Sequence, residues 1–240
     1  MSFPKSILKG IWQIQKRSHS LQVFLSKCYY YLNRNNRRIH GKRNVLKIEG
    51  AYLKKVEINI AGDDNYISIG ANSRVSNVKI EMKGSGHCLE IGESCILAAG
   101  SFWFQTRDCR IIVGNQTTFE EANVSALEPK AKVQIGEDCM FSYDVHIRNG
   151  DSHSILDLES NQRINLGRDI YIGDHVWLGA HVNVLKGVTI GENSVIGIRS
   201  LVTSDIPSHC VAAGLPAKVK RSSTYWTRDL IEEEERPVSS

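Results

Sequence analysis

The residues that decide the fold are 170–202, which divide into hexads as IYIGDH-VWLGAH-VNVLKG-VTIGEN-SVIGIR-SLV. The third residue of each hexad is aliphatic, at positions 172, 178, 184, 190, 196 and 202, and glycine follows four of these six. A period of six suits neither an α-helix nor an array of β-hairpins. It suits a chain that turns a corner at every hexad and buries one aliphatic side chain at each corner. The stretch therefore predicts an all-β fold, a parallel β-helix with three flat faces.

A repeat with a longer period precedes the hexads. Aliphatic residues followed by glycine recur at a constant interval of 22, at Ile69, Ile91, Val113 and Ile135. Because three hexads make one coil, this longer interval predicts a coil with a bulge of four residues at a corner. In this division Trp103, two hexads after Ile91, is expected to point into the core.

The repeats also predict how the chain is divided. They extend over residues 45–219, which are expected to form one β-helix domain whose ends require caps. An interruption of the repeat predicts a loop insertion over residues 148–169. Residues 220–240 remain as a tail, in which Trp226–Glu235 is expected to form a short, solvated helix.

The N-terminal segment carries an uneven charge. Residues 1–48 contain eleven Lys or Arg and no Asp or Glu, and their apolar residues follow the spacing of an amphipathic helix. We therefore expect a helical extension over residues 1–44. Such a helix can lie on an anionic membrane surface, bind an acidic polymer, cap the open end of the β-helix or pack against a partner subunit. The sequence leaves these alternatives open.

Composition argues against several other classes of protein. No apolar run approaches the roughly 18 residues of a membrane span, and no signal peptide is visible. We expect a cytoplasmic chain, peripheral at the inner face of the plasma membrane if residues 1–40 bind lipid, and no nucleic-acid partner. The six cysteines form no CxxC pair, which argues against a zinc site or a disulfide framework. Cys95 and Cys139 share a column with Ser73 and Thr117 and are expected to be packing residues.

Several segments carry motifs more specific than the periodicity. They are IGEDCMFS at 135–142, IGDHVWLG at 172–179, GENSVIG at 191–197, VTSDIP at 202–207 and VAAGLPAK at 211–218. With these motifs, the region from Asn123 to Arg221 resembles the hexapeptide-repeat acyltransferases, above all the galactoside and maltose acetyltransferases and the capsular sialic-acid O-acetyltransferases. The resemblance implies a left-handed β-helix, a homotrimer, acetyl-CoA as the donor and a carbohydrate as the acceptor, without a metal.

The interruption of the repeat contains the candidate base. Residues 148–153 read RNGDSH and lie in a loop of the kind that carries binding and catalytic groups on rigid scaffolds. His153 corresponds to the loop histidine of the family, and an imidazole is suited to taking the proton of an alcohol that attacks a thioester. His146 is the alternative base. Arg148 and Asp151 are candidate contacts of the acceptor.

Two further residues take catalytic roles from the resemblance. Asn123 corresponds to the asparagine that supports the acceptor and the tetrahedral intermediate, where a neutral amide can donate to the developing oxyanion. Trp177 corresponds to the tryptophan that lines the donor tunnel near the histidine of a neighbouring subunit. An aromatic residue that merely covers the wall of the β-helix would show the same pattern.

The resemblance also implies where the donor binds. Pantetheine is expected along the coil edge at Ala180 and Gly197, and Arg199, Lys218 and Arg221 are candidates for the phosphates of coenzyme A. A solvated surface cation is the alternative role for each of these basic residues. The family usually has a small residue after the glycine at 197, whereas isoleucine and arginine stand there in this chain. Because of this departure, the contacts that coenzyme A makes near residue 197 are expected to differ from those of the family.

Together these inferences describe an acetyl-CoA-dependent O-acetyltransferase that acts on a sugar hydroxyl of a capsular or other cell-surface polysaccharide, polymers with sialic acid included. An N-acetyltransferase of an amino-sugar nucleotide has the same fold and donor and is the main alternative. A trimeric β-helix metal hydratase would need His175 and His181 as ligands across an interface, because they project from adjacent faces of the coil. A non-enzymatic scaffold would need neither the closing motif nor the His153 loop.

Overall fold

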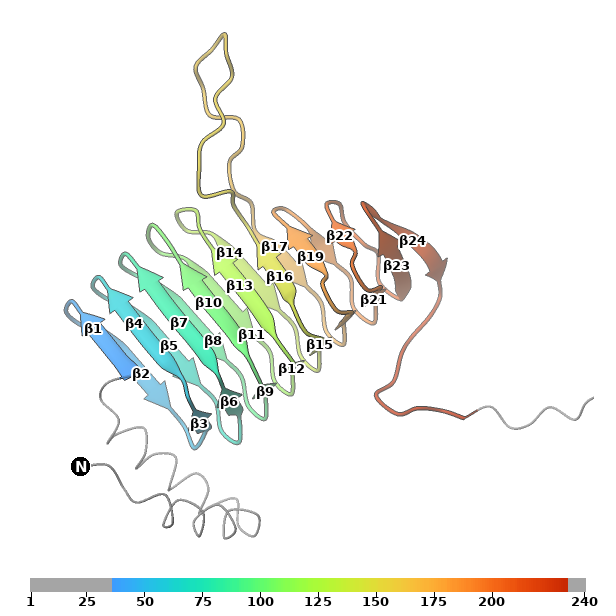
Figure 1. The fold of residues 1–240 in the computed structure, drawn as a ribbon, viewed down its shortest axis with the longest axis horizontal. Coiled ribbons are helices and arrows are strands. Elements are labelled where there is room, and N and C mark those ends of the chain that lie inside the picture. Colours follow the sequence, from blue (N-terminus) through green and yellow to red (C-terminus); the bar gives the residue numbers. More distant parts are fainter. Residues whose placement is uncertain (1–35, 233–240) are drawn as a thin grey trace, which may run out of the picture.

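The chain winds into a β-helix with three flat faces, and each face is a sheet (Figure 1). A computed structural model describes residues 36–232, so most of the helical extension expected over residues 1–44 lies outside the described residues, as do residues 233–240. Successive strands along the chain belong to successive sheets, so each coil contributes one strand to each face. The expected parallel β-helix is confirmed. The part of the chain that the structure describes contains no helix long and apolar enough to span a bilayer.

The three sheets have eight, seven and nine strands. Sheet A consists of β1 (Arg37–His40), β4 (Glu57–Ala61), β7 (Val78–Lys83), β10 (Gly100–Phe104), β13 (Ala122–Ala126), β16 (Val145–Arg148), β19 (Asn183–Leu185) and β22 (Leu201–Val202). Sheet B consists of β2 (Val45–Ile48), β5 (Tyr66–Ile69), β8 (Cys88–Ile91), β11 (Arg110–Val113), β14 (Lys132–Ile135), β17 (Ile170–Ile172) and β20 (Thr189–Ile190). Sheet C consists of β3 (Tyr52–Lys54), β6 (Arg74–Ser76), β9 (Ile96–Leu97), β12 (Thr118–Phe119), β15 (Met140–Phe141), β18 (Trp177–Leu178), β21 (Val195–Ile196), β23 (Cys210–Gly214) and β24 (Ala217–Ser222).

The register between coils explains the two rhythms of the sequence. In sheet A, Ile80 of β7 pairs with Phe102 of β10, and the two residues are separated by the longer interval, 22 positions. Val184 of β19 pairs with Val202 of β22, which is the interval of three hexads. Parallel pairing carries the aliphatic column of one coil onto that of the next. The sequence period is therefore the length of one coil, as predicted.

The four extra residues of the longer coils do not form one bulge. β7 has six residues where β19 has three, and residues 84–87 enlarge the corner between sheets A and B. Gly84 begins this corner at φ +117, and a Cβ placed on it would lie 1.8 Å from the Thr106 carbonyl oxygen of the next coil. The corner thus requires glycine because two stacked turns approach closely.

The extra length also changes which side chains enter the core. Phe102 and Phe104 of β10 are buried, whereas Trp103 between them faces outward beneath the ammonium of Lys83, which is 4.7 Å from the ring centroid. The predicted inward position of Trp103 was wrong. In the longer coils the corner between sheets C and A is one residue shorter, so Phe102 follows the buried Leu97 by five residues rather than six.

The β-helix starts earlier than predicted. β1 pairs in parallel with β4, so the first coil begins at Arg37 rather than at residue 45. Its outward side chains include Arg38 and His40, which are exposed. Charged residues are typical of edge strands, because they discourage pairing with another chain. The basic composition of this segment therefore concealed a strand.

The predicted C-terminal helix was wrong as far as residue 232. β24 turns back antiparallel onto β23, and residues 223–232 contain no helix. The indole nitrogen and the backbone carbonyl of Trp226 are instead hydrogen-bonded to His175 beside sheet C. These tertiary contacts outweigh the weak local preference for a helix.

Small polar side chains form a column inside the corner between sheets B and C. The backbone N–H of Cys95 donates to Ser73 Oγ at 3.0 Å, and that of Cys139 donates to Thr117 Oγ1 at 3.1 Å. Both cysteines are fully buried free thiols, so their predicted role as packing residues is confirmed. Burial raises the pKa of Cys139 to about 12, which keeps this thiol unreactive.

A second column fills the corner between sheets A and B. It contains the side chains of Asn44, Asn65, His87 and Cys109, and each of the first three accepts a hydrogen bond from the backbone N–H of the next. The other ring nitrogen of His87, Nε2, lies 3.1 Å from the Lys83 carbonyl oxygen. His87 is fully buried, and burial lowers its pKa below the ordinary value of 6.5. The column thus holds a neutral imidazole.

We predict that His87 makes the stability of the fold depend on pH. The unfolded chain protonates this ring near its ordinary pKa of 6.5, whereas the folded chain does so only at lower pH. The contribution of His87 is therefore complete above about pH 6.5 and is lost as the pH falls through the folded pKa. His87→Asn keeps an acceptor in the column, as Asn65 does one coil earlier, but it does not titrate. Thermal unfolding at about pH 7.5 and about pH 5.5 should show a smaller fall in Tm for His87→Asn than for the wild type. An equal fall in both proteins would assign the titration to another group.

Candidate active site

The chain leaves the β-helix between β16 and β17, at the corner between sheets A and B. The intervening residues, 149–169, form an arm that stands away from the body (Figure 1). Within the arm, an antiparallel bridge joins Leu156 to Arg163. The arm carries His153 and occupies the loop insertion predicted over residues 148–169.

The base of the arm is held by the buried side chain of Asn165. Its Nδ2 donates to Asp151 Oδ2 and to the His153 carbonyl oxygen, both at 2.8 Å. Its Oδ1 accepts from the Ile155 N–H at 2.8 Å. One amide thus fixes the backbone around His153. The imidazole of His153 is exposed and has no hydrogen-bond partner within residues 36–232, so it is free to meet a substrate.

Ion pairs tie the arm to the β-helix. Lys186, which follows β19, pairs with Asp151, and Arg163 pairs with Glu128 of the preceding coil. Lys186 Nζ also lies 3.1 Å from the Asn165 carbonyl oxygen. The hydrogen bonds from Lys186 and Asn165 hold the pKa of Asp151 below its usual value. Asp151, a predicted acceptor contact, is therefore an ionised support of the arm.

Arg148, the other predicted acceptor contact, also braces the arm. Its Nε donates to the Gly150 carbonyl oxygen at 3.0 Å, and its Nη2 donates to Ser152 Oγ at 2.9 Å. The guanidinium thus bends over the residues that lead to His153. In this structure both charged candidates serve the geometry of the loop.

A row of polar side chains crosses the outer surface of sheet A. The register aligns Ser101 of β10, Asn123 of β13, His146 of β16 and Asn183 of β19. Ser101 Oγ donates to Asn123 Oδ1 at 2.7 Å, which leaves Asn123 Nδ2 without a partner among the described residues. A free amide donor of this kind suits a developing oxyanion.

The alternative base, His146, is tethered to a carboxylate. Its Nε2 lies 2.9 Å from Asp144 Oδ1, and His181 Nδ1 lies 2.6 Å from Asp144 Oδ2. The hydrogen bonds from His181 and His146 lower the pKa of Asp144. A carboxylate that orients an imidazole is a feature of catalytic bases. His146 therefore keeps its place as the alternative to the untethered His153.

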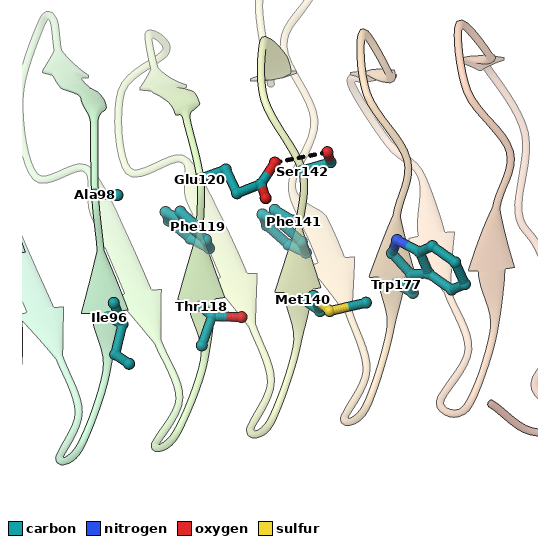
Figure 2. A pocket seen from close by; sticks show the side chains of 9 residues that line it. All are labelled: Ile96, Ala98, Thr118, Phe119, Glu120, Met140, Phe141, Ser142 and Trp177. Atoms are coloured by element: carbon teal, nitrogen blue, oxygen red, sulfur yellow. Dashed lines mark hydrogen bonds between the residues drawn. The ribbon is translucent and has the colours of Figure 1, made fainter. Parts of the chain in front are cut away.

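Trp177 begins β18 and faces outward from sheet C, with 37% of its surface exposed. It lies at one end of a groove that crosses β9, β12, β15 and β18 (Figure 2). The groove is lined by Ile96, Ala98, Thr118, Phe119, Glu120, Met140, Phe141, Ser142 and Trp177. Ser142 Oγ donates to Glu120 Oε2 at 2.9 Å. The groove is thus mainly apolar, with one hydrogen-bonded polar pair.

The residues expected to hold the donor fall into two groups. Ala180 and Gly197 lie at the corner between sheets C and A, and Arg199 joins them because its backbone N–H donates to the Ala180 carbonyl oxygen at 2.8 Å. The side chain of Arg199 is exposed. Lys218 and Arg221 are exposed on β24, at the end of sheet C. The structure brings the first three together and places the last two on the closing strand.

The two histidines considered for a metal lie at different corners. His175, between sheets B and C, contacts Asp138 at 2.8 Å, whereas His181, between sheets C and A, contacts Asp144. Among residues 36–232, no group of three or more His, Cys, Asp or Glu side chains is arranged to hold a metal ion.

His153 and Trp177 lie on opposite sides of one coil. The arm leaves the corner between sheets A and B, and sheet C is the face opposite that corner in a three-faced coil. Both residues nevertheless belong to the coil made by β16, β17 and β18, so they share a level along the β-helix. Within one chain the structure does not bring them together. It does place Asn123 next to His146.

Two supporting residues were missed from the sequence. Ser101 lies one coil before Asn123, and the longer period of the sequence could have found it, because the register equates the two positions. Asn165 lies in a polar arm without periodicity, so no pattern marked it. Its importance becomes visible only when its hydrogen bonds to Asp151, His153, Ile155 and Arg163 are seen together.

Comparison with known proteins identifies the family. Residues 169–203 match the bacterial transferase hexapeptide family of six repeats. A polysialic acid O-acetyltransferase of Neisseria meningitidis is 34% identical over 148 residues, which are 61% of this chain and 68% of that protein. A polysialic acid O-acetyltransferase of Escherichia coli O1:K1 / APEC is 35% identical over 135 residues. This second alignment covers 55% of this chain and less than half, 44%, of the length of the relative.

A solved structure extends the likeness to the upstream coils. The crystal structure of the polySia-specific acetyltransferase NeuO matches with a TM-score of 0.78 at 32% identity. The match covers 82% of this chain and 91% of that chain. It confirms the left-handed β-helix, and the longer upstream coils fall within a shared architecture. From the repeat, the matched coils and these relatives, the chain belongs to the hexapeptide-repeat acyltransferases.

Proposed function

We propose that this protein is an O-acetyltransferase that moves an acetyl group from acetyl-CoA to a sugar hydroxyl of a cell-surface polysaccharide. The observation that carries the proposal is the free imidazole of His153, held on an arm whose base is fixed by Asn165. Two relatives with the name polysialic acid O-acetyltransferase favour a polymer of sialic acid as the acceptor class.

Each residue has a defined part in the transfer. His153 takes the proton of the attacking hydroxyl while the hydroxyl oxygen forms a bond to the thioester carbonyl carbon. Asn123 Nδ2 donates to the oxyanion of the tetrahedral intermediate. When the intermediate collapses, the carbon–sulfur bond breaks, and the leaving thiolate of coenzyme A receives the proton from His153. Trp177 lines the path of the donor, with Ala180 and Gly197 along its pantetheine.

The proposed site is shared between subunits of a homotrimer. His153 and Trp177 face opposite sides of the same coil, so one chain alone separates them. In a cyclic assembly with parallel axes, residues of equal height in two subunits remain at equal height. The arm of one subunit can then reach sheet C of its neighbour beside Trp177.

The surface of the arm supports this arrangement. It exposes a set of large apolar side chains, namely Ile155, Leu156, Leu158, Ile164 and Leu166. Leu158 is 99% exposed and Ile164 is 64% exposed. A cluster of this kind on a protruding segment marks a contact with another protein surface. A second copy of the chain offers the mainly apolar groove next to Trp177.

We predict that His153→Ala lowers kcat by about 10²–10⁴-fold, because general-base catalysis contributes that much. The KM for acetyl-CoA should change little. Release of coenzyme A is followed with a thiol reagent in the presence of polysialic acid, and NMR of the product distinguishes an ester from an amide. An amide formed on an amino-sugar nucleotide, without ester on the polymer, would overturn the proposed reaction in favour of N-acetylation.

The matched control for the base is His146→Gln. It removes the imidazole that lies in the polar row and keeps an amide that can reach Asp144. Its turnover should stay within a few-fold of the wild type. Normal turnover of His153→Ala together with an inactive His146→Gln would move the role of the base to His146.

We predict that Leu158→Glu combined with Ile164→Glu breaks the trimer, because it buries two charges in the proposed contact. Light scattering on a sizing column measures the mass in solution. Val45→Glu is the control, since Val45 is also exposed but lies on β2 in the first coil. A double variant that remains trimeric and fully active would rule out the arm as the contact.

Complementation tests the shared site through activity. His153→Ala and Trp177→Ala chains, each inactive alone, should regain part of the activity when they are refolded together. Mixed trimers contain interfaces in which one chain supplies an intact His153 and its neighbour an intact Trp177. No recovery in demonstrably mixed trimers would place both residues in one chain's own site.

We also propose that the basic N-terminal segment docks on an anionic membrane surface. Residues 1–35, which precede β1, hold six Lys or Arg and no Asp or Glu, and each cation near such a surface contributes about 1 kcal/mol. Removing residues 1–35, which stops before β1, should abolish salt-sensitive binding to anionic liposomes. Activity on a short soluble acceptor should stay within a few-fold. Loss of the trimer on truncation, or no liposome binding by the intact chain, would refute the proposal.

A further inference from the structure

After β24 the chain returns along the corner between sheets B and C. Residues 223–230, here called the C-terminal strap, run toward earlier coils. Trp226 lies beside His175, and Arg228 lies beside Asp138, one coil before His175. The strap therefore crosses two coils next to the strand that begins with Trp177.

Trp226 is the centre of the strap. Its side chain is 7% exposed and lies flat on the ring of His175, with centroids 4.1 Å apart and planes 9° apart. Trp226 Nε1 donates to the His175 carbonyl oxygen at 2.7 Å, and the Trp226 carbonyl oxygen lies 3.0 Å from His175 Nε2. The other ring nitrogen of His175 lies 2.8 Å from Asp138 Oδ2. The stacking and the hydrogen bond from Nε1 thus hold the indole against His175.

Arg228 anchors the strap one coil further on. Its Nη2 and Nε lie 2.9 and 3.1 Å from Asp138 Oδ1, and its Nη1 donates to Thr118 Oγ1 at 3.1 Å. Thr118 lines the groove that ends at Trp177. Partial burial opposes the ionisation of Asp138, but His175 and Arg228 outweigh it and hold the pKa of this carboxyl below its usual value. An ionised Asp138 thus links the strap to sheet C.

The strap touches the candidate donor site through Trp226. The rings of Trp226 and Trp177 have centroids 5.8 Å apart and planes inclined by 50°, a favourable tilted aromatic contact. Trp177 lies on a strand of two residues. Among the described residues its indole nitrogen has no hydrogen-bond partner. The contact with Trp226 therefore restrains one side of this partly exposed ring.

We propose that the C-terminal strap positions Trp177 for the acyl donor, with Trp226 as the positioning residue and Arg228 as its anchor. The inference rests on the proposed function, in which Trp177 lines the path of acetyl-CoA. A displacement of about 1 Å in a site can cost about 10²-fold in rate. Because the strap lies at the corner between sheets B and C, away from the arm of the same chain, it acts on the donor side of the reaction.

The test compares three variants of the strap. Trp226→Ala should raise the KM for acetyl-CoA about tenfold and leave the KM for the acceptor within about twofold. Trp226→Phe keeps a ring between His175 and Trp177 and should restore the KM for acetyl-CoA to within about threefold of the wild type. Tyr225→Ala is the matched control, since Tyr225 is the neighbouring aromatic and is 79% exposed. It should behave as the wild type.

A second measurement reports on the environment of the Trp177 ring and does not rely on activity. In protein labelled with 5-fluorotryptophan, ¹⁹F NMR of Trp177→Phe identifies the Trp177 signal. This signal should shift in Trp226→Ala and stay unchanged in Tyr225→Ala. A shift in a protein that does not turn over acetyl-CoA would uphold the positioning and reject the proposed function. An unmoved signal with an unchanged KM would overturn the positioning, and so would equal rises in both KM values with a lower Tm, which would make the strap a structural cap.

Discussion

The structure depends on the stacking of each coil on the one before it, at the spacing of about 4.8 Å that parallel strands require. Every corner must lie over the previous corner, and the N–H groups turned inward there need acceptors. Two columns supply them, through Ser73 and Thr117 at one corner and Asn65 and His87 at another. The corners therefore favour polar side chains that can accept a hydrogen bond, which explains why an imidazole lies in an apolar core.

This stacking also limits where chemistry can arise. A repeating coil offers the same kind of outward surface many times, and residues in it are fixed in height and direction. Two segments leave this repeat, the arm after β16 and the strap after β24, and each lies beside candidate site residues. In a three-faced coil, the corner that releases the arm is opposite the face that carries Trp177. If the two segments serve one reaction, the site needs a second subunit.

The periodic parts of the structure were predictable from the sequence, and the contacts between segments were not. The hexads and the longer upstream interval follow from coil length, so the pairing of Val184 with Val202 and of Ile80 with Phe102 was implied. The strand β1 was hidden by its charge, since an edge strand tolerates basic residues. Trp226 was read as part of a helix because its partner, His175, is 51 residues away. A local sequence pattern carries no information about a contact between residues so far apart in the chain.

The arm and the strap share more than their irregularity, because each has an anchor on the coil of β13, β14 and β15. The arm is tied through Arg163 to Glu128, which lies between β13 and β14, and the strap is tied through Arg228 to Asp138, which lies between β14 and β15. Both anchors thus belong to the coil before the one that carries His153 and Trp177. Backbone ladders hold these two coils in register. The β-helix therefore sets the relative height of His153 and Trp177.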